Sequence, residues 1–409
     1  MNDKNLGSQK NKLKKIKKSP ELRFKGFSDD WEQRKLGELS DNIFGGGTPK
    51  TSIPEYWEGT IPWIQSSDLN TDELFNIAPN KYITDIAVKD SATKLVPANS
   101  IAIVTRVGVG KLAFMPFQYA TSQDFLSLSN LNIDNIFSIF SIYRILQKEL
   151  KNIQGTSIKG ITKPDLLAKT ISVPIKMEEQ KKIGTFFKQL DNTITLHQRK
   201  LDKLKQLKQG YLQKLFPNLG ENIPKFRFAY FEDVWEQRKL SEIVKITMGQ
   251  SPNSENYTTN PDDYILVQGN ADMKNGRVFP RVWTTQITKI AEKNDLILSV
   301  RAPVGDIGKT DYNVVLGRGV AAIKGNEFIF QLLGKMKQNG YWTKLSTGST
   351  FESINSVDIK NAQILLPSGK EQIQIGYFFQ LLDNTIFLHQ SKLDKLKTIK
   401  KSLLQKMFI

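Results

Sequence analysis

The side chains that most often carry catalysis are scarce in this sequence. Its only two histidines, His197 and His389, occupy equivalent places in two copies of a repeated segment. Because a Ser-His-Asp hydrolase needs a histidine that faces a cleft, these two positions do not suit that chemistry. The sequence also has no cysteine, no spacing typical of zinc ligands and no Gly-x-x-x-x-Gly-Lys-[Ser/Thr] phosphate loop. We therefore expect a chain without catalytic residues and without a metal site.

Two short motifs come close to catalytic ones. The glycines at 45–47 are too few for a phosphate loop and lack its lysine, so a turn is the better interpretation. The segment 260–264, Asn-Pro-Asp-Asp-Tyr, faintly resembles the Asn-Pro-Pro-Tyr loop of adenine methyltransferases. It lacks the second proline, and no Gly-x-Gly follows a strand nearby. We interpret both segments as loops.

A different chemistry is available to polar residues at matching places in the two halves of the chain. In each half one predicted strand ends in a glutamine and a later one ends in an arginine, and aligning the arginines places Gln123 opposite Arg318. Arginine can bind guanine, and glutamine adenine, through two hydrogen bonds in the major groove of DNA. Singly, each residue could instead be a surface or turn residue. As a group, the base-reading candidates are Gln65, Arg106, Gln123, Gln268, Arg301 and Arg318.

Three lysines near the same turns are candidates for contacts with DNA phosphates. Such contacts position a protein on the duplex but do not read its sequence. The candidates are Lys111, Lys159 and Lys309.

The charge balance favours a polyanionic partner. The chain has 58 Lys and Arg against 41 Asp and Glu, a formal net charge of +17. DNA is the commonest such partner, although a merely soluble basic protein is the alternative. Apolar runs such as 136–142 fall far short of the ~20 residues that span a bilayer, and no apolar stretch follows the lysine-rich segment 1–20. We expect a cytoplasmic protein with no membrane partner.

The chain contains an internal duplication. Trp31–Leu36 recurs letter for letter at Trp235–Leu240. A longer segment, 178–216, matches 370–408 at a constant shift of 192, with roughly 25 of the 39 positions identical. The segments between these matches diverge. A duplication that keeps one segment while the other drifts indicates a shared partner and a changed target.

Each conserved copy predicts one long helix with an apolar seam. Seam positions recur at spacings of four and three, which is the heptad pattern of a coiled coil. The first copy has no internal proline and ends before Pro217, so about thirty residues give a rod of roughly 50 Å. Because such a seam is not stable in water, we expect the two copies to pack on each other. The seam residues are Ile183, Phe187, Leu190, Ile194, His197, Leu201 and Leu204, and Ile375, Phe379, Leu382, Ile386, His389, Leu393 and Leu396.

The diverged segments have the pattern of α/β (α+β) domains. Each opens with a glycine-containing turn, continues with the strands that precede the polar candidates, and has a later amphipathic helix, predicted at 134–153 and 327–344. We expect five parts: a disordered basic tail (1–20), a first α/β domain (21–175), a central helical region (176–216), a second α/β domain (217–369) and a distal helical region (370–409).

The ordered set of these segments is specific to one family. Segments 46–49, 56–57, 61–64, 68–69 and 249–252 resemble the opening of a target recognition domain. Segments 179–187 and 371–379, each leading into Leu-Asp-Asn-Thr-Ile, resemble the conserved helices of the same family. Over nearly all of 21–409 the chain resembles the specificity subunit of a type I restriction–modification system.

The resemblance implies a non-catalytic subunit that reads DNA for its partners. Two modification subunits would bind S-adenosylmethionine and methylate adenine, and restriction subunits would use ATP and Mg to translocate DNA. No cofactor would bind this chain. The two domains would read the two half-sites of a bipartite double-stranded target, and the helical pair would set their spacing.

An antiparallel helix pair suits that role. It would let the domains straddle a spacer, with half-sites about one turn, roughly 34 Å, apart. It would also bring His197 and His389 together. The alternative is that each histidine packs separately against a modification subunit.

Two other classes of function stay open at this point. One is a self-contained methyltransferase–specificity fusion with unrecognised catalytic motifs, which would bind S-adenosylmethionine as an isolated chain. The other is a structural coiled-coil scaffold, which would give no sequence-specific footprint on DNA.

Overall fold

The computed structural model describes residues 18–152, 160–218, 220–346 and 352–409. It divides into two compact units, the first made of Met1–Leu196 with Asp394–Ile409 and the second of His197–Leu393. The expected disordered tail falls almost wholly on residues 1–17, outside the described residues, as does Lys159. No helix in the described residues is long and apolar enough to span a membrane.

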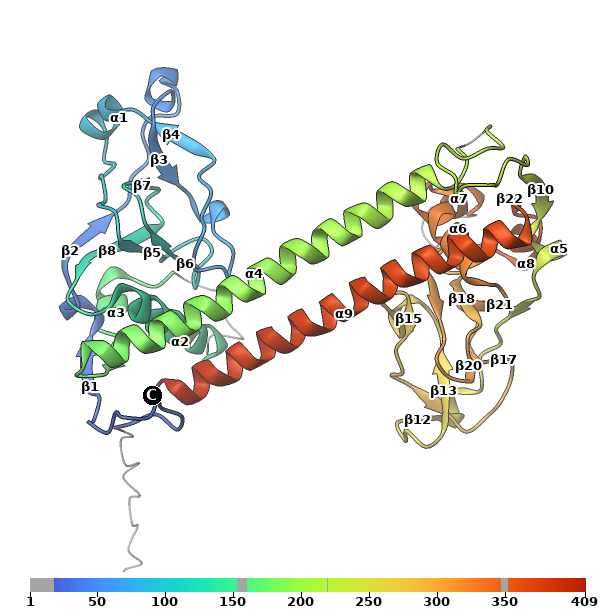
Figure 1. The fold of residues 1–409 in the computed structure, drawn as a ribbon. Coiled ribbons are helices and arrows are strands. Elements are labelled where there is room, and N and C mark those ends of the chain that lie inside the picture. Colours follow the sequence, from blue (N-terminus) through green and yellow to red (C-terminus); the bar gives the residue numbers. More distant parts are fainter. Residues whose placement is uncertain (1–17, 153–159, 219, 347–351) are drawn as a thin grey trace, which may run out of the picture. The chain divides into compact units, whose positions relative to one another are not determined.

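The first unit contains two main sheets (Figure 1). A four-stranded antiparallel sheet has the order β2-β8-β5-β6, and a three-stranded sheet has the order β4-β3-β7, in which β3 and β7 run parallel. A separate pair joins β1 to β9. The elements are β1 (Glu32–Lys35), β2 (Ser40–Gly45), β3 (Ile61–Ile64), β4 (Lys81–Ile83), α1 (Asp85–Asp90), β5 (Ser100–Val104), β6 (Leu112–Met115), β7 (Ala120–Thr121), β8 (Phe125–Leu131), α2 (Asn135–Asn152), α3 (Lys163–Leu167) and β9 (Thr170–Val173).

The second unit repeats this plan with added strands. Its sheets have the orders β11-β21-β18-β19-β15-β14 and β12-β16-β13-β20-β17, and β13 and β20 run parallel as β3 and β7 do. The strands are β10 (Glu236–Lys239), β11 (Ile246–Met248), β12 (Tyr257–Thr258), β13 (Tyr264–Val267), β14 (Met273–Lys274), β15 (Arg277–Val278), β16 (Trp283–Thr284), β17 (Ile290–Ala291), β18 (Leu296–Ser299), β19 (Ile307–Lys309), β20 (Val314–Leu316), β21 (Val320–Ile323) and β22 (Gln363–Leu366). The helices before the last long one are α5 (Leu240–Ile243), α6 (Glu327–Gln338), α7 (Tyr341–Leu345) and α8 (Ser356–Lys360).

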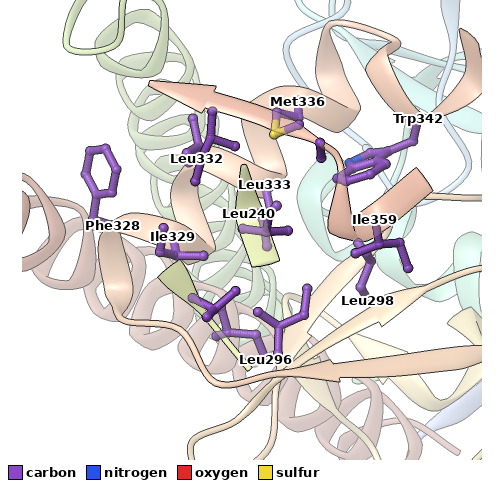
Figure 2. Close-up of a cluster of buried hydrophobic side chains, with 14 of the residues drawn as sticks. Leu240, Leu296, Leu298, Phe328, Ile329, Leu332, Leu333, Met336, Trp342 and Ile359 are labelled. Carbon is purple, nitrogen blue, oxygen red and sulfur yellow. The ribbon is translucent and has the colours of Figure 1, made fainter. Parts of the chain in front are cut away.

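The amphipathic helices cover the sheets. In Figure 2, α6 directs Ile329 and Leu333 toward Leu296 and Leu298 of β18, and these four side chains are at most 1% exposed. The apolar residues of α6 recur on one face, as a helix that packs on a sheet requires. The single helix predicted over 327–344 is wrong in its second part. Gly340 has a left-handed backbone, φ 69°, so the helix ends and a short new one begins.

The two long helices are α4 (Met177–Lys214) and α9 (Gly369–Met407), and they pack antiparallel. In the second unit, His197 lies beside His389, and further along α4 the ammonium of Lys208 lies 2.7 Å from a carboxylate oxygen of Asp383. In the first unit, Lys400 and Asp191 form an ion pair of 2.5 Å. As the residue number rises on α4, its partner's number falls on α9.

All fourteen seam residues predicted on these helices are buried or partly buried. The best buried on α4 are Ile183, Phe187 and Leu201, and Leu393 on α9 is 1% exposed. The rings of His197 and His389 are 5.6 Å apart. The pKa of His197 is lowered, mainly because its imidazole is partly buried. The nearby charges of Lys392, His389 and Lys200 lower it further.

Each unit encloses an aromatic cluster that is completed by a phenylalanine just after the end of a long helix. In the first unit, Phe408 stacks on Phe137 with ring centroids 5.4 Å apart and also contacts Trp31. In the second unit, Phe216 stacks on Phe328 at 5.1 Å and contacts Trp235. Since the same residue types recur, the two cores are built alike.

A buried ion pair ties each unit's leading segment to the first turn of a long helix. Arg23 donates two hydrogen bonds to Glu179, of 2.7 and 2.8 Å, and the Glu179 side chain is only 2% exposed. Arg227 binds Glu371 in the same way, at 2.8 and 2.7 Å. The repeat of Trp31 and Trp235 extends to these arginines, a signal that the sequence contains and that our prediction did not use.

Candidate nucleic-acid interface

In the second unit, two base-reading candidates meet at one edge of a sheet. Because β13 and β20 are parallel, their carboxyl ends lie together, with Gln268 just after β13 and Arg318 just after β20. The two turns are joined by a 2.7 Å hydrogen bond from the Gly317 amide to the Val267 carbonyl. Parallel strands commonly carry ligand-binding residues at this end.

Two glycines allow this close approach. A Cβ on Gly317 would lie 3.0 Å from the Cα of Gln268, and one on Gly319 would lie 2.1 Å from the Gln268 carbonyl oxygen. The backbone around Arg318 can therefore pack against Gln268 only because its neighbours have no side chain. The Arg318 side chain is exposed.

A hydrogen-bonded support fixes Gln268. Its side-chain amide donates to the Tyr257 hydroxyl at 2.9 Å, and its backbone amide donates to Asp272 at 2.7 Å. Asp272 is 2% exposed and also pairs with Arg281 at 3.0 Å. The charge of Arg281 is thus balanced, while the carbonyl oxygen of the Gln268 side chain and one amide hydrogen stay available to a ligand.

Arg301 joins Gln268 and Arg318 along one cleft of about 630 Å³. It follows β18 and is exposed, and its carbonyl accepts a 2.9 Å hydrogen bond from the Ser299 hydroxyl. Neither Arg301 nor Arg318 forms a side-chain ion pair or hydrogen bond with another described residue, so both guanidinium groups can bind a partner. The other lining residues are Ser251, Tyr257, Gly269, Asn270, Ala271, Asp272, Arg281, Ser299, Ala302, Pro303 and Gly319.

The first unit repeats the arrangement at the ends of β3 and β7. The Ser122 amide donates to the Ile64 carbonyl at 2.9 Å, which brings Gln65 and Gln123 to the same sheet edge. Asp68 accepts from the Gln65 backbone amide at 2.9 Å, as Asp272 does for Gln268. Gln123 and Arg106 are exposed, and Arg106 follows β5 as Arg301 follows β18.

The glycine-containing turns expected at the start of each domain contact the residues after β7 and β20, which include Gln123 and Arg318. A Cβ on Gly46 would lie 1.8 Å from the Ser122 carbonyl oxygen, so only glycine fits there. From the same turn the Thr48 hydroxyl donates to the side-chain oxygen of Gln123 at 2.5 Å. In the second unit the Ser251 hydroxyl accepts from the Arg318 backbone amide at 3.1 Å.

The phosphate candidates differ in how free they are. Lys111 donates to the Ser66 carbonyl at 3.0 Å and keeps its charge unpaired by any described carboxylate. Lys309 forms a close ion pair with Glu327 of α6, which balances its charge. The pair gives Lys309 a structural role that its place in the sequence did not suggest.

From the sequence we did not single out Tyr257 or Asp272, and we included Asp68 only as part of the family segment 68–69, without a role for it. An aspartate shortly after each strand-ending glutamine was the available signal. Its spacing differs between the halves because Gly269 adds a residue to the second turn. In the described residues no group of three or more histidine, cysteine, aspartate and glutamate side chains is placed to hold a metal ion.

Comparison with known proteins assigns the chain to a family. Residues 28–206 and 232–398 both match the family described as type I restriction modification DNA specificity domain. Together they span most of the chain. The chain therefore belongs to the family of type I restriction–modification DNA specificity subunits.

Individual relatives agree with this assignment. The chain is 26% identical over 404 residues to a putative type I restriction enzyme MjaX specificity subunit from Methanocaldococcus jannaschii, with 92% of each chain covered. It is 44% identical over 89 residues to the Escherichia coli EcoR124I/EcoR124II specificity subunit, which is 22% of this chain and 21% of the other. The crystal structure of a type I S subunit from M. genitalium matches with a TM-score of 0.67 at 18% identity, covering 96% of this chain and 99% of that one.

The chain is thus a non-catalytic DNA specificity subunit with two target recognition domains. The expected class of protein and fold class are both confirmed.

Proposed function

We propose that each recognition domain reads one half of a bipartite DNA target with the polar side chains at its parallel strand ends. The first domain is assigned to 21–175 and the second to 217–369. The observation that carries this proposal is the recurrence of one geometry in two diverged domains. In both domains, three polar residues follow equivalent strands. They are a glutamine whose backbone amide is bound by an aspartate, an arginine whose side chain has no partner among the described residues, and a third polar residue.

The base contacts proposed are those of arginine with guanine and of glutamine with adenine. Gln65, Arg106 and Gln123 serve the first half-site, and Gln268, Arg301 and Arg318 serve the second. Lys111 supplies a phosphate contact. Lys159 stays a candidate by its sequence alone, and Lys309 is the weakest because Glu327 already balances its charge.

The long helices carry the shared part of the function. A type I complex needs a modification subunit that methylates DNA with S-adenosylmethionine and restriction subunits that use ATP and Mg, and we propose that this chain recruits them. Two modification subunits, one for each half of the duplication, suit the conserved copies α4 and α9. The proposed setting is the cytoplasm, where the host DNA lies.

A domain exchange tests the proposal. Residues 21–175 are replaced by the same region of a relative with another target, and the complete complex is expressed in a host without other type I systems. Sequencing of methylated adenines should show one altered half-site and one unchanged half-site. Exchange of 217–369 is the matched control and should alter the other half. A change in both halves after either exchange would refute the assignment.

A further inference from the structure

Gln123 and Arg318 occupy the same place in their domains. Each follows the second strand of the parallel pair, β7 or β20. The opening turn binds that strand's end alike, since the Gly47 amide donates to Thr121 at 2.8 Å and the Gln250 amide donates to Leu316 at 2.9 Å. One residue later in each turn, Thr48 or Ser251 makes the next hydrogen bond. The two positions are therefore equivalent in backbone, although the turn hydroxyl bonds the side chain of Gln123 and the backbone amide of Arg318.

The two positions differ in chemistry, while the other candidates do not. Gln65 and Gln268 are both glutamines, and Arg106 and Arg301 are both arginines. At the third position the first domain presents an amide and the second a guanidinium. Since an amide pairs with adenine and a guanidinium with guanine, this is the one place among the six candidates where the domains would select different bases.

Each side chain is set up for its base. The Thr48 hydroxyl holds the Gln123 side-chain oxygen at 2.5 Å, which fixes the orientation of the amide. That oxygen keeps one lone pair to accept from the adenine amino group, and the nitrogen can donate to adenine N7. For Arg318 the support holds the backbone only, so its guanidinium can donate to both guanine acceptors.

We propose that Gln123 and Arg318 are specificity-determining residues, selecting adenine in the first half-site and guanine at the equivalent place in the second. This inference rests on the proposed function above. It predicts that the exchange of one residue changes one base.

The test uses the complete complex and sequencing of its methylated sites. Arg318→Gln should convert one G·C position of the second half-site into A·T and leave the first half-site unchanged. Arg318→Lys is the matched control, because it keeps the charge but loses the two-pronged geometry, and it should relax that position. For the unaltered complex, replacing this guanine by adenine should weaken binding about 10–100-fold.

Other outcomes would overturn the inference in distinguishable ways. If the complex with Arg318→Gln methylates sites with any base at that position, Arg318 reads the base as proposed, but the amino-acid type at residue 318 does not by itself select adenine or guanine. If affinity instead falls equally on all sequences, Arg318 contacts phosphate, and the domain exchange alone then decides the proposed function. Should the variant fail to fold, Gln123→Arg in the first domain gives the reciprocal test, and an unchanged adenine there would equally refute the inference.

Discussion

Removal of Glu179 should destabilise the first unit far more than removal of its neighbour Glu178. Glu179 is buried and receives two of the three hydrogen bonds of the Arg23 guanidinium, whose own side chain is 13% exposed. Glu179→Ala would leave that largely buried guanidinium without its carboxylate partner, with the Asp29 carbonyl as its remaining acceptor. Breaking a buried pair in this way costs about 3–5 kcal/mol.

The magnitude can be separated from helix effects because Glu178 is a matched control. Both residues lie in the first turn of α4, where a carboxylate is favoured by the helix dipole, but Glu178 is exposed. Glu178→Ala should lower the free energy of unfolding by about 0.5 kcal/mol or less through the lost surface contacts. The lost interaction with the helix dipole should add an effect of similar size.

Urea unfolding of the purified chain, followed by a probe in the first unit, measures the two variants. Hydrogen exchange of the amides of β5 is suitable, because all five residues of this strand are buried in that unit. The double variant Arg23→Met/Glu179→Leu should regain much of the loss, since it removes both charges together. Equal destabilisation by Glu178→Ala and Glu179→Ala would refute the reasoning.

Three further predictions follow from the described structure. Leu333→Ala, at a fully buried site on α6, should cost about 2–5 kcal/mol in urea unfolding, whereas Lys344→Ala on the exposed side of α7 should cost little. Because the pKa of His197 is lowered in the folded chain, the unfolded chain binds more protons, so the free energy of unfolding should fall as pH drops below about 6.5. Urea unfolding over a pH series should show a smaller fall for His197→Gln, and an identical fall would contradict the lowered pKa. The isolated chain should neither bind S-adenosylmethionine nor transfer methyl groups to DNA, which calorimetry and a radiolabel assay can check, and methyl transfer by the pure chain would refute its non-catalytic role.

The long helices could be predicted because their pattern is local. The heptad spacing of Ile183 to Leu204 and its second copy specify a buried face without reference to the rest of the fold. The end of α6 was harder, since an amphipathic pattern continues past Gly340 while its left-handed backbone stops the helix. Only the backbone conformation, not the apolar pattern, decides that boundary.

The candidate interface was predictable in its residue types and less so in its supports. Alignment of two arginines sufficed to pair Gln123 with Arg318. The contacts that hold these residues, such as Tyr257 with Gln268, join short strands that are distant in sequence. β7 and β20 consist of two and three residues, too few for a period to be visible. The pairing of Lys309 with Glu327 was equally hidden from the sequence, because this contact depends on how α6 packs.

The aromatic core of the first unit has a consequence for the synthesis of the protein. Trp31, Phe137 and Phe187 emerge early, but the ring that completes their cluster belongs to Phe408, about 220 residues after Phe187. At roughly 5–20 residues per second, the ribosome needs about 10–40 s to supply it. The second unit has no such delay for Phe216, which precedes most of the core that it joins. A chain interrupted before Phe408 would therefore carry an unfinished first unit, and such incompletely folded chains are removed by the cell's proteases.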